Sequence, residues 1–261
     1  MSDVILELRN VSKRFGSVIA LNGVNLALKR GEVHCLLGDN GAGKSTLIKT
    51  LAGVHQPSSG DYLVNGQTVH FKSPREALDQ GVATVYQDLA LVPLLSVWRN
   101  FFMGREPSKK LFGLIPVLDA ELAAATACDR LAGMGIMVRD ANQAVGSMSG
   151  GERQCLAIAR AIHFGANVLI LDEPTAALGV KQAFNVLKLI HKARERGISV
   201  IFITHNVHHA YPIADSFTLL NRGRSLGTYA KQDISKDAVL DMMAGGAEMQ
   251  VLMRELDGVT I

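Results

Sequence analysis

The stretch that decides the fold is rich in glycine and lies near the N-terminus: Gly38-Asp39-Asn40-Gly41-Ala42-Gly43-Lys44-Ser45-Thr46. It fits the pattern G-x-x-x-x-G-K-[ST] of a phosphate-binding loop. We expect its three glycines to allow positive φ and, lacking Cβ, to let backbone N–H groups close around phosphate oxygens. Lys44 would reach the outer phosphates as a point charge, and the Ser45 hydroxyl would bind Mg²⁺. The alternative is a glycine-rich turn that matches the pattern by chance.

The residues on either side of this loop favour the phosphate-binding interpretation. The apolar run at 33–37 predicts a strand, and residues 44–52 predict a helix that Gly53 closes. Phosphates in the loop would then lie at a helix N-terminus, where free amides and the helix dipole attract anions.

Composition narrows the possible classes of protein. With 261 residues the chain predicts one large domain or two small ones, and a formal charge of +3 does not indicate nucleic-acid binding. The three cysteines, Cys35, Cys128 and Cys155, form no C-x-x-C pair and no metal-ligand spacing, which predicts a reduced, cytosolic protein. We find neither a leader pattern nor a run of about 18 apolar residues, so we expect any work at a membrane to be done from outside it.

The N-terminal part predicts strands joined by short turns. Residues 4–11 and 24–28 read as strands, and between them Phe15 precedes a turn, where its ring would either stack on a purine or fill a hairpin core. Asn65-Gly66 predicts a type I′ hairpin turn. Ser73 with Glu76 predicts a capped helix that ends at Gly81, and residues 82–86 predict the next strand.

Gln87 stands at the end of that strand, where its amide would bind Mg²⁺ or the attacking water; a plain polar strand end is the alternative. From about residue 96 to 144 the β-branched runs vanish, and Asp119 caps an Ala/Leu-rich stretch that stops at Gly133. We interpret 96–144 as an inserted, mostly helical subdomain within a nucleotide-binding core formed by 1–95 and 145–261.

A second glycine-rich segment opens a predicted helix at Ser149-Gly150-Gly151-Glu152. Ser149 and Glu152 match a capping box. A cap alone does not need two glycines, and their missing side chains would leave amides exposed to an incoming phosphate. We expect both roles.

Two carboxylates follow a continuous apolar run at 168–171, the pattern of a parallel strand buried on both faces. Adjacent carboxylates at a buried strand end are costly unless cations or water use them. Asp172 suits Mg²⁺, and Glu173 suits a general base, with a pair of surface carboxylates as the alternative. His205 follows the next predicted strand at the edge where ligands bind in such sheets, although a single histidine is often structural.

The ordered set of phosphate loop, Gln87, Ser149 segment, Asp172-Glu173 and His205 resembles the ATP-binding subunit of an ABC transporter over nearly the whole chain. The resemblance implies an α/β P-loop NTPase with an antiparallel β subdomain and an inserted helical subdomain. It also implies ATP and Mg²⁺ as cofactors, and catalytic roles for Lys44, Gln87, Glu173 and His205. Two ATP molecules would be sandwiched in a head-to-tail homodimer on the cytoplasmic face of the membrane, beside permease subunits and a periplasmic sugar-binding protein.

Local segments are most similar to the monosaccharide-import branch, and residues 148–166 and 177–180 to its fructose importers. That branch commonly carries two fused ATPase copies, whereas we find one phosphate loop and no internal repeat, so this chain would pair with itself. The family often has Gln where Glu152 stands and Asp where Gly179 stands, and the second difference puts coupling between the two sites in question.

Two other functions stay open. A soluble ABC-type ATPase acting on ribosomes or DNA usually shows tandem copies, coiled-coil insertions or basic patches, and none is visible. A catalytically silent nucleotide switch does not explain why Glu173 and His205 are both present. For the insert, we expect aromatic residues at 97–102 either to be exposed for membrane partners or to form its own core.

Overall fold

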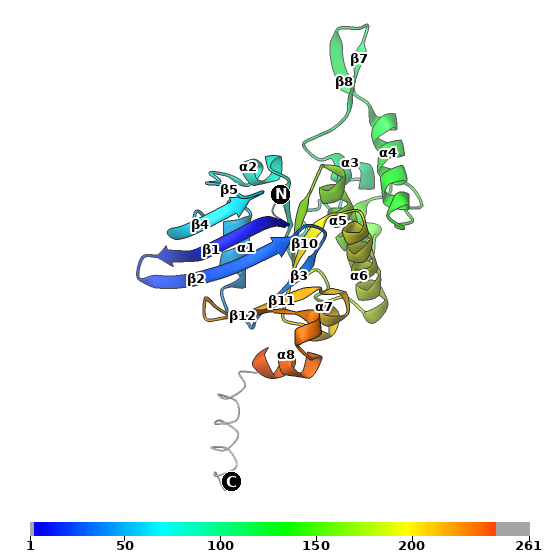
Figure 1. Cartoon of the computed structure of the whole chain (residues 1–261). Helices are drawn as coiled ribbons and strands as arrows, with labels where there is room; N and C mark the ends of the chain where they lie inside the picture. The colour runs from blue at the N-terminus through cyan, green and yellow to red at the C-terminus, as the bar shows by residue number, and fades with distance from the viewer. Residues whose placement is uncertain (1–2, 244–261) are drawn as a thin grey trace, which may run out of the picture.

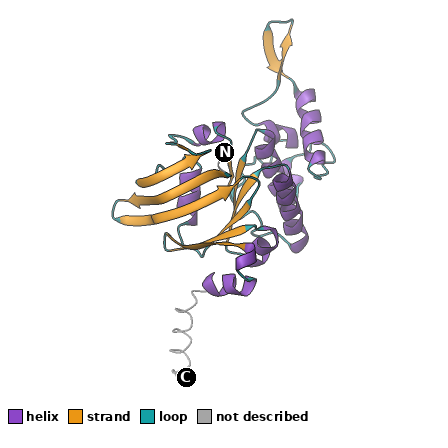
Figure 2. Cartoon of the chain, in the orientation of Figure 1, coloured by secondary structure: helices purple, strands orange, loops and turns teal. Residues whose placement is uncertain are grey.

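The computed structural model describes residues 3–243. Within that range the chain forms two main sheets and one isolated hairpin (Figures 1 and 2). The larger sheet has the strand order β12-β11-β3-β10-β9-β6. Its bounds are β3 Val33–Leu37, β6 Val82–Val85, β9 Val168–Asp172, β10 Ser199–Thr204, β11 Ser216–Asn221 and β12 Arg224–Ala230.

The central strands of this sheet are parallel, and only β12 runs antiparallel to its neighbour. Side chains alternate between the two faces of a strand, so each central strand contributes to two separate hydrophobic cores. On β9, for example, Leu169 and Leu171 belong to one core and Ile170 to the other. Burial of both faces explains why these strands read as continuous apolar runs.

One of the two cores lies beneath the smaller, antiparallel sheet, whose order is β2-β1-β4-β5. Its strands are β1 Val4–Phe15, β2 Val18–Lys29, β4 Ser59–Val64 and β5 Gln67–Thr68, and α1 (Lys44–Leu51) packs in the same core. Asn65 and Gly66 both have positive φ (52° and 77°), which confirms the predicted I′-type turn. The predicted helix end is confirmed as well, because Gly53 follows α1 with φ 74°.

The other core is covered by helices on the opposite face of the large sheet (Figure 2). Besides α1, the structure describes the helices α2 Pro74–Asp79, which packs in the first core, α3 Val97–Phe102, α4 Ala120–Gly133, α5 Gly150–His163, α6 Val180–Glu195, α7 Val207–Ile213 and α8 Lys236–Met243, with short 3₁₀ turns at Val145–Ser147 and Lys231–Asp233. Cys35 and Cys155 are buried. Burial raises the pKa of the Cys155 thiol to about 12, which leaves it unreactive.

The segment between β6 and α5 differs from the prediction in one element. Besides α3 and α4 it holds a β-hairpin, β7 (Ser108–Leu111) paired with β8 (Ile115–Leu118), which projects from the top of the molecule in Figure 1.

The aromatic residues of α3 are not exposed, so the hypothesis that they meet a partner is wrong. Trp98 is 4% exposed and Phe101 fully buried, and the rings of Phe101 and Phe102 pack against His163 and Phe164 next to the end of α5. They are core residues, as the alternative predicted, but the core is not the insert's own, since His163 and Phe164 lie outside 96–144.

The topology brings the motifs of the sequence to one edge of the large sheet. The loop after β3, Gln87 after β6, Glu173 after β9 and His205 after β10 all follow the carboxyl ends of parallel strands. Ligands bind at this edge in open α/β sheets.

Candidate nucleotide-binding site

The phosphate loop turns tightly between β3 and α1. Gly41 and Gly43 have φ of 82° and 103°, as predicted, because only glycine adopts such values without strain. Gly38 does not have positive φ, which corrects the prediction for that position. A Cβ on Gly38 would lie 2.5 Å from the carbonyl oxygen of Leu220 on β11, so this glycine is required by close packing.

Lys44 lies in the first turn of α1 and is 8% exposed. Its Nζ donates hydrogen bonds to the carbonyl oxygens of Gly38 (2.6 Å) and Asp39 (3.1 Å), which hold the ammonium inside the loop. The ammonium is therefore placed where a bound anion would replace these carbonyls as its partner.

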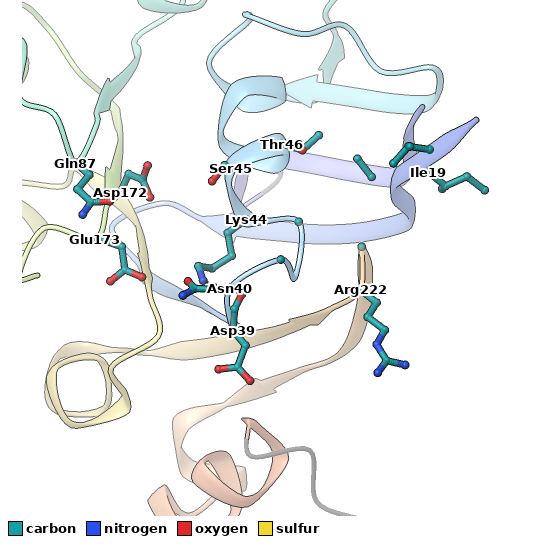
Figure 3. Close-up of a pocket in the computed structure, with 15 residues that line it drawn as sticks. Ile19, Asp39, Asn40, Lys44, Ser45, Thr46, Gln87, Asp172, Glu173 and Arg222 are labelled. Carbon is teal, nitrogen blue, oxygen red and sulfur yellow. Dashed lines mark hydrogen bonds between the residues drawn. The ribbon is translucent and has the colours of Figure 1, made fainter. Parts of the chain in front are cut away.

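The loop opens into a cavity of about 530 Å³. The predicted site residues that line it are Asp39, Asn40, Gly41, Gly43, Lys44, Ser45, Thr46, Gln87, Asp172 and Glu173. In Figure 3, Gln87, Asp172 and Glu173 face Lys44 and Ser45 across the cavity. Gly38 and Ala42 belong to the same loop without lining the cavity, and His205 contacts it through Glu173.

Asp172 is the carboxylate with a perturbed acidity in this cavity. Partial burial and the neighbouring charge of Glu173 raise the pKa of Asp172, and Lys44 opposes this shift. A carboxylate whose charge is disfavoured by its surroundings is stabilised by a cation. Asp172, the Ser45 hydroxyl and the Gln87 amide supply the hard oxygen donors that suit Mg²⁺. Within residues 3–243 no group of three or more His, Cys, Asp or Glu side chains is placed to hold a metal ion.

Glu173 is fixed by three hydrogen bonds. Its Oε2 accepts from the Thr204 hydroxyl (2.8 Å), and its Oε1 accepts from the backbone N–H of His205 (3.1 Å) and lies 2.7 Å from His205 Nδ1. Its backbone has φ 46°, and its N–H donates to Ile203 O (2.9 Å). A non-glycine residue in this left-handed region stores strain, which is typical of functional positions.

Sequence reasoning missed several residues of this site. Val18, Ile19 and Ala20 on β2, with Arg222 and Gly223 after β11, line the cavity opposite the carboxylates. These two segments lie together because the backbone at Gly223 packs closely on β2: a Cβ on Gly223 would lie 2.5 Å from Ala20 O. The glycine at 223 was the available signal. Thr204 was also missed, and nothing local distinguishes it from other strand residues.

Phe15 lies outside the lining of the cavity, at the turn between β1 and β2. It is 43% exposed, with Lys13 Nζ 5.1 Å from its ring centroid and the His55 ring packed at 5.1 Å. The alternative of a hairpin core residue is therefore wrong, and one part of its ring stays accessible.

The Ser149 segment forms the predicted capping box, in which Glu152 N–H donates to Ser149 Oγ and Glu152 Oε2 accepts from Ser149 N–H at 2.7 Å. The Glu152 charge is thus directed to its own helix. Gly151 also allows close packing on α6, since a Cβ there would lie 2.9 Å from Gln182 Cβ. This segment lines a separate cavity of about 300 Å³, and none of its residues lines the cavity of the phosphate loop.

Comparison with known proteins shows which family this chain resembles. The family model described as ABC transporter matches residues 21–176. The chain is 41% identical to the xylose/arabinose import ATP-binding protein XylG of Sulfolobus acidocaldarius, with 98% of this chain and 99% of that protein covered. It is also 41% identical to the fructose import ATP-binding protein FrcA of Rhizobium meliloti, covering 94% and 95%. It spans about half (48%) of a putative ribose/galactose/methyl galactoside import ATP-binding protein of Burkholderia cenocepacia, at 39% identity.

Solved structures give the same fold. A nucleotide-free ATP-binding cassette from an ABC transporter superposes with a TM-score of 0.80 at 23% identity, covering 91% of this chain and 96% of that one. The dimeric structure of a bacterial ABC transporter cassette superposes with a TM-score of 0.73 at 26% identity, covering 87% and 99%. Among the described residues of this chain, no helix is long and apolar enough to cross a membrane.

Proposed function

The chain belongs to the ABC transporter family of ATP-binding proteins, and from that premise we propose that it hydrolyses ATP to drive import of a monosaccharide through a membrane permease. The observation that carries this proposal is the convergence of Lys44, Ser45, Gln87, Asp172 and Glu173 on one cavity. These side chains combine phosphate binding, metal binding and a base in the arrangement that phosphoryl transfer to water needs.

Glu173 is the proposed general base. Its carboxylate, fixed by Thr204 and His205, would accept a proton from the water that attacks the γ-phosphate. Lys44 would stabilise the negative charge that develops on the phosphate oxygens. Mg²⁺, held by Ser45, Asp172 and Gln87, would supply further charge neutralisation when bound. Gln87 is thereby placed to report the state of the site to the segment that follows it.

Each complete site is proposed to need two copies of the chain. The Ser149 segment lies outside the phosphate-loop cavity of its own chain, so it would contact a nucleotide bound in that cavity only from a second copy. A head-to-tail homodimer would bring the partner's free amides at the α5 N-terminus to those phosphates. The relative solved as a dimer supports this arrangement. Phe15 would stack on the purine, since its ring is partly accessible at the turn between β1 and β2, and β2 also lines the cavity.

The permease is proposed to dock in a groove of about 380 Å³ between the core and the insert. Tyr86, next to Gln87, lines this groove, as do Thr84, Met103, Arg105 and Phe164. A helical segment of the permease carrying an acidic side chain would pair with Arg105.

The monosaccharide is proposed to be a pentose or hexose of the kind named for its relatives, with fructose first because the likeness includes a fructose importer. A periplasmic sugar-binding protein would be the second partner, and the chain would act from the cytoplasmic face as a peripheral subunit. Sugar contacts would belong to the permease and the binding protein.

The experiment that tests this function is Glu173→Gln, made both in the purified chain and in the cell's own copy. We expect ATP to bind as before and hydrolysis to fall by roughly 10²–10⁴-fold, the usual contribution of a general base. Uptake of one labelled sugar from a panel of xylose, arabinose, ribose, galactose and fructose should be lost. Unchanged turnover would remove Glu173 as the base. Lost hydrolysis with uptake of every sugar unchanged would instead indicate an ATPase that acts away from sugar import.

A further inference from the structure

The β7–β8 hairpin is a feature that ATP hydrolysis leaves unexplained. It projects away from both sheets and from the helices that cover them (Figures 1 and 2). Its base is closed by the Asp119 N–H, which donates to Pro107 O at 2.9 Å, and by Lys109 Nζ, which lies 3.6 Å from Asp119 Oδ1. Strand pairing then runs from Ser108 opposite Leu118 to Leu111 opposite Ile115.

The tip of this hairpin is apolar and open to solvent. Phe112 is 88% exposed and Leu114 84%, and behind them Leu111 and Ile115 are 45% and 57% exposed. A two-stranded hairpin in water is marginally stable and gains little from such side chains unless another surface covers them. The tip therefore carries apolar surface that the chain itself does not bury, which marks an interaction site.

Charge and geometry identify that surface. Residues 108–118 contain two lysines, Lys109 and Lys110, and no acidic residue, and Lys109 pairs with Asp119 at the base of the hairpin. The lysines precede the apolar tip directly on β7, so this strand changes from basic to apolar towards the tip, whereas β8 is apolar from Ile115 to Leu118. A protein groove would be matched by one apolar face, but here opposite faces carry apolar residues, Leu111 with Ile115 on one and Leu118 on the other. Apolar side chains on both faces, with two lysines behind the tip on β7, instead match an anionic bilayer, whose headgroups lie outside its acyl chains.

We propose that the tip, Leu111 to Ile115, inserts into the headgroup boundary of an anionic lipid bilayer while Lys109 and Lys110 contact the headgroup phosphates. Four strand residues extend about 13 Å, enough to carry the tip about 5–10 Å into that boundary while the lysines stay among the headgroups. The hairpin starts close to Met103 and Arg105, which line the groove assigned above to the permease. The hairpin and the groove would then face the same membrane. This shared orientation rests on the proposed function, whereas the proposal that the hairpin binds lipid does not depend on it.

The test is flotation of the full chain with permease-free vesicles, made either of phosphatidylcholine alone or with phosphatidylglycerol added. We expect binding to the anionic vesicles that rises as salt is lowered. Lys109→Gln with Lys110→Gln should weaken it by about 5-fold per lysine. Phe112→Ser with Leu114→Ser should weaken it by roughly 10-fold or more, since both side chains lose burial. Leu94→Ser, at a side chain 91% exposed outside the hairpin, is the matched control and should bind like wild type.

Two readouts separate lipid contact from misfolding. All variants should keep the wild-type melting temperature and basal ATPase rate, because the hairpin lies away from the nucleotide cavity. In Phe112→Trp the new indole should shift its emission to the blue on anionic vesicles and be quenched by brominated lipid, over a constant signal from buried Trp98.

Three results would overturn the proposal. The first is that the tip variants and the lysine variants float with vesicles as well as Leu94→Ser does. Another is tip variants that lose binding only to detergent-solubilised permease, which would assign the hairpin to a protein partner. The third is tip variants that change the oligomeric state in solution while vesicle binding is absent throughout, which would assign it to a second copy of this chain.

Discussion

We propose that Thr204 acts on catalysis through another residue, Glu173. Its hydroxyl donates to Glu173 Oε2 at 2.8 Å and accepts from the Asn206 N–H at 3.0 Å, and the side chain is 1% exposed. It thereby sets the direction of the carboxylate that we assign as the base. Thr204 is therefore a positioning residue for Glu173.

Thr204→Val keeps the shape and removes both hydrogen bonds. We expect kcat to fall roughly 10-fold while the KM for ATP stays the same, because a hydrogen bond to a charged group contributes about 1.5–3 kcal/mol. Thr204→Ser is the matched control and should keep most of the rate. Equal kcat values in the two variants would mean that Glu173 is oriented by His205 alone.

The raised pKa of Asp172 predicts how the stability of the metal-free protein depends on pH. Because burial and Glu173 raise its pKa in the folded state, the folded protein holds this proton more tightly than the unfolded chain does. Its contribution to the free energy of unfolding is therefore largest at low pH and is lost as pH rises through the folded pKa. With a chelator present, Asp172→Asn should melt higher than wild type at neutral pH, and the difference should shrink towards pH 4. A difference that grows as pH falls would contradict the raised pKa.

At the scale of elements, the contact between α5 and α6 depends on one glycine more than on its neighbour. A Cβ on Gly151 would lie 2.9 Å from Gln182 Cβ and 3.4 Å from its Cα, whereas a Cβ on Gly150 would meet only the Leu178 Cδ2 methyl, at 3.1 Å. Gly151→Ala should lower the free energy of unfolding by about 1–3 kcal/mol, the usual cost of overpacking. Gly150→Ala should be close to neutral by thermal melting. Equal losses would show that α6 moves aside as a unit.

Elements whose signals are local were predictable, and those that depend on distant contacts were not. Ser73, Asp119 and Ser149 each cap the helix expected from the sequence, because a cap bonds to backbone groups within three residues. The burial of Phe101 and Phe102 could not be predicted, since the rings of His163 and Phe164, at the C-terminal end of α5, pack against them. Gly38 was explained wrongly for the same reason: its constraint comes from Leu220 on β11.

The site shows the same division. Lys44, Ser45, Gln87, Asp172 and Glu173 followed from motifs at strand ends, and parallel strands place those ends at one edge. Ile19 and Arg222 line the cavity from elements with no motif of their own. The hairpin of β7 and β8 was missed because two four-residue strands with exposed faces give too short a pattern to recognise.

For the whole molecule, the separation of the Ser149 segment from the phosphate-loop cavity predicts complementation between inactive chains. Lys44→Ala and Ser149→Arg should each abolish ATPase, since each homodimer has two damaged sites under two-fold symmetry. In a mixed dimer both lesions fall on one site, and the other pairs an intact loop with an intact Ser149 segment. Activity should reappear on mixing, up to roughly half the wild-type rate per dimer if one site suffices.

The control for this experiment mixes Lys44→Ala with a chain that carries both substitutions, a pair that leaves no intact site. No recovery in the first mixture, with mixed dimers demonstrated by tagged pull-down, would contradict the shared site or require both sites to work together. Dilution offers a separate check, because ATPase per chain should fall at concentrations where the dimer dissociates.

The backbone of Glu173 has a consequence for how this chain would evolve. At φ 46° any side chain with a Cβ costs on the order of 1 kcal/mol relative to glycine. On the proposed function, selection for hydrolysis would keep glutamate there against that cost. If selection were relaxed in a descendant, glycine or asparagine at 173 would be favoured, whereas Gly41 and Gly43 have no strain to relieve. Position 173 should therefore change earlier than the phosphate loop, and the residue found there in a diverged copy records whether that lineage still hydrolyses its nucleotide.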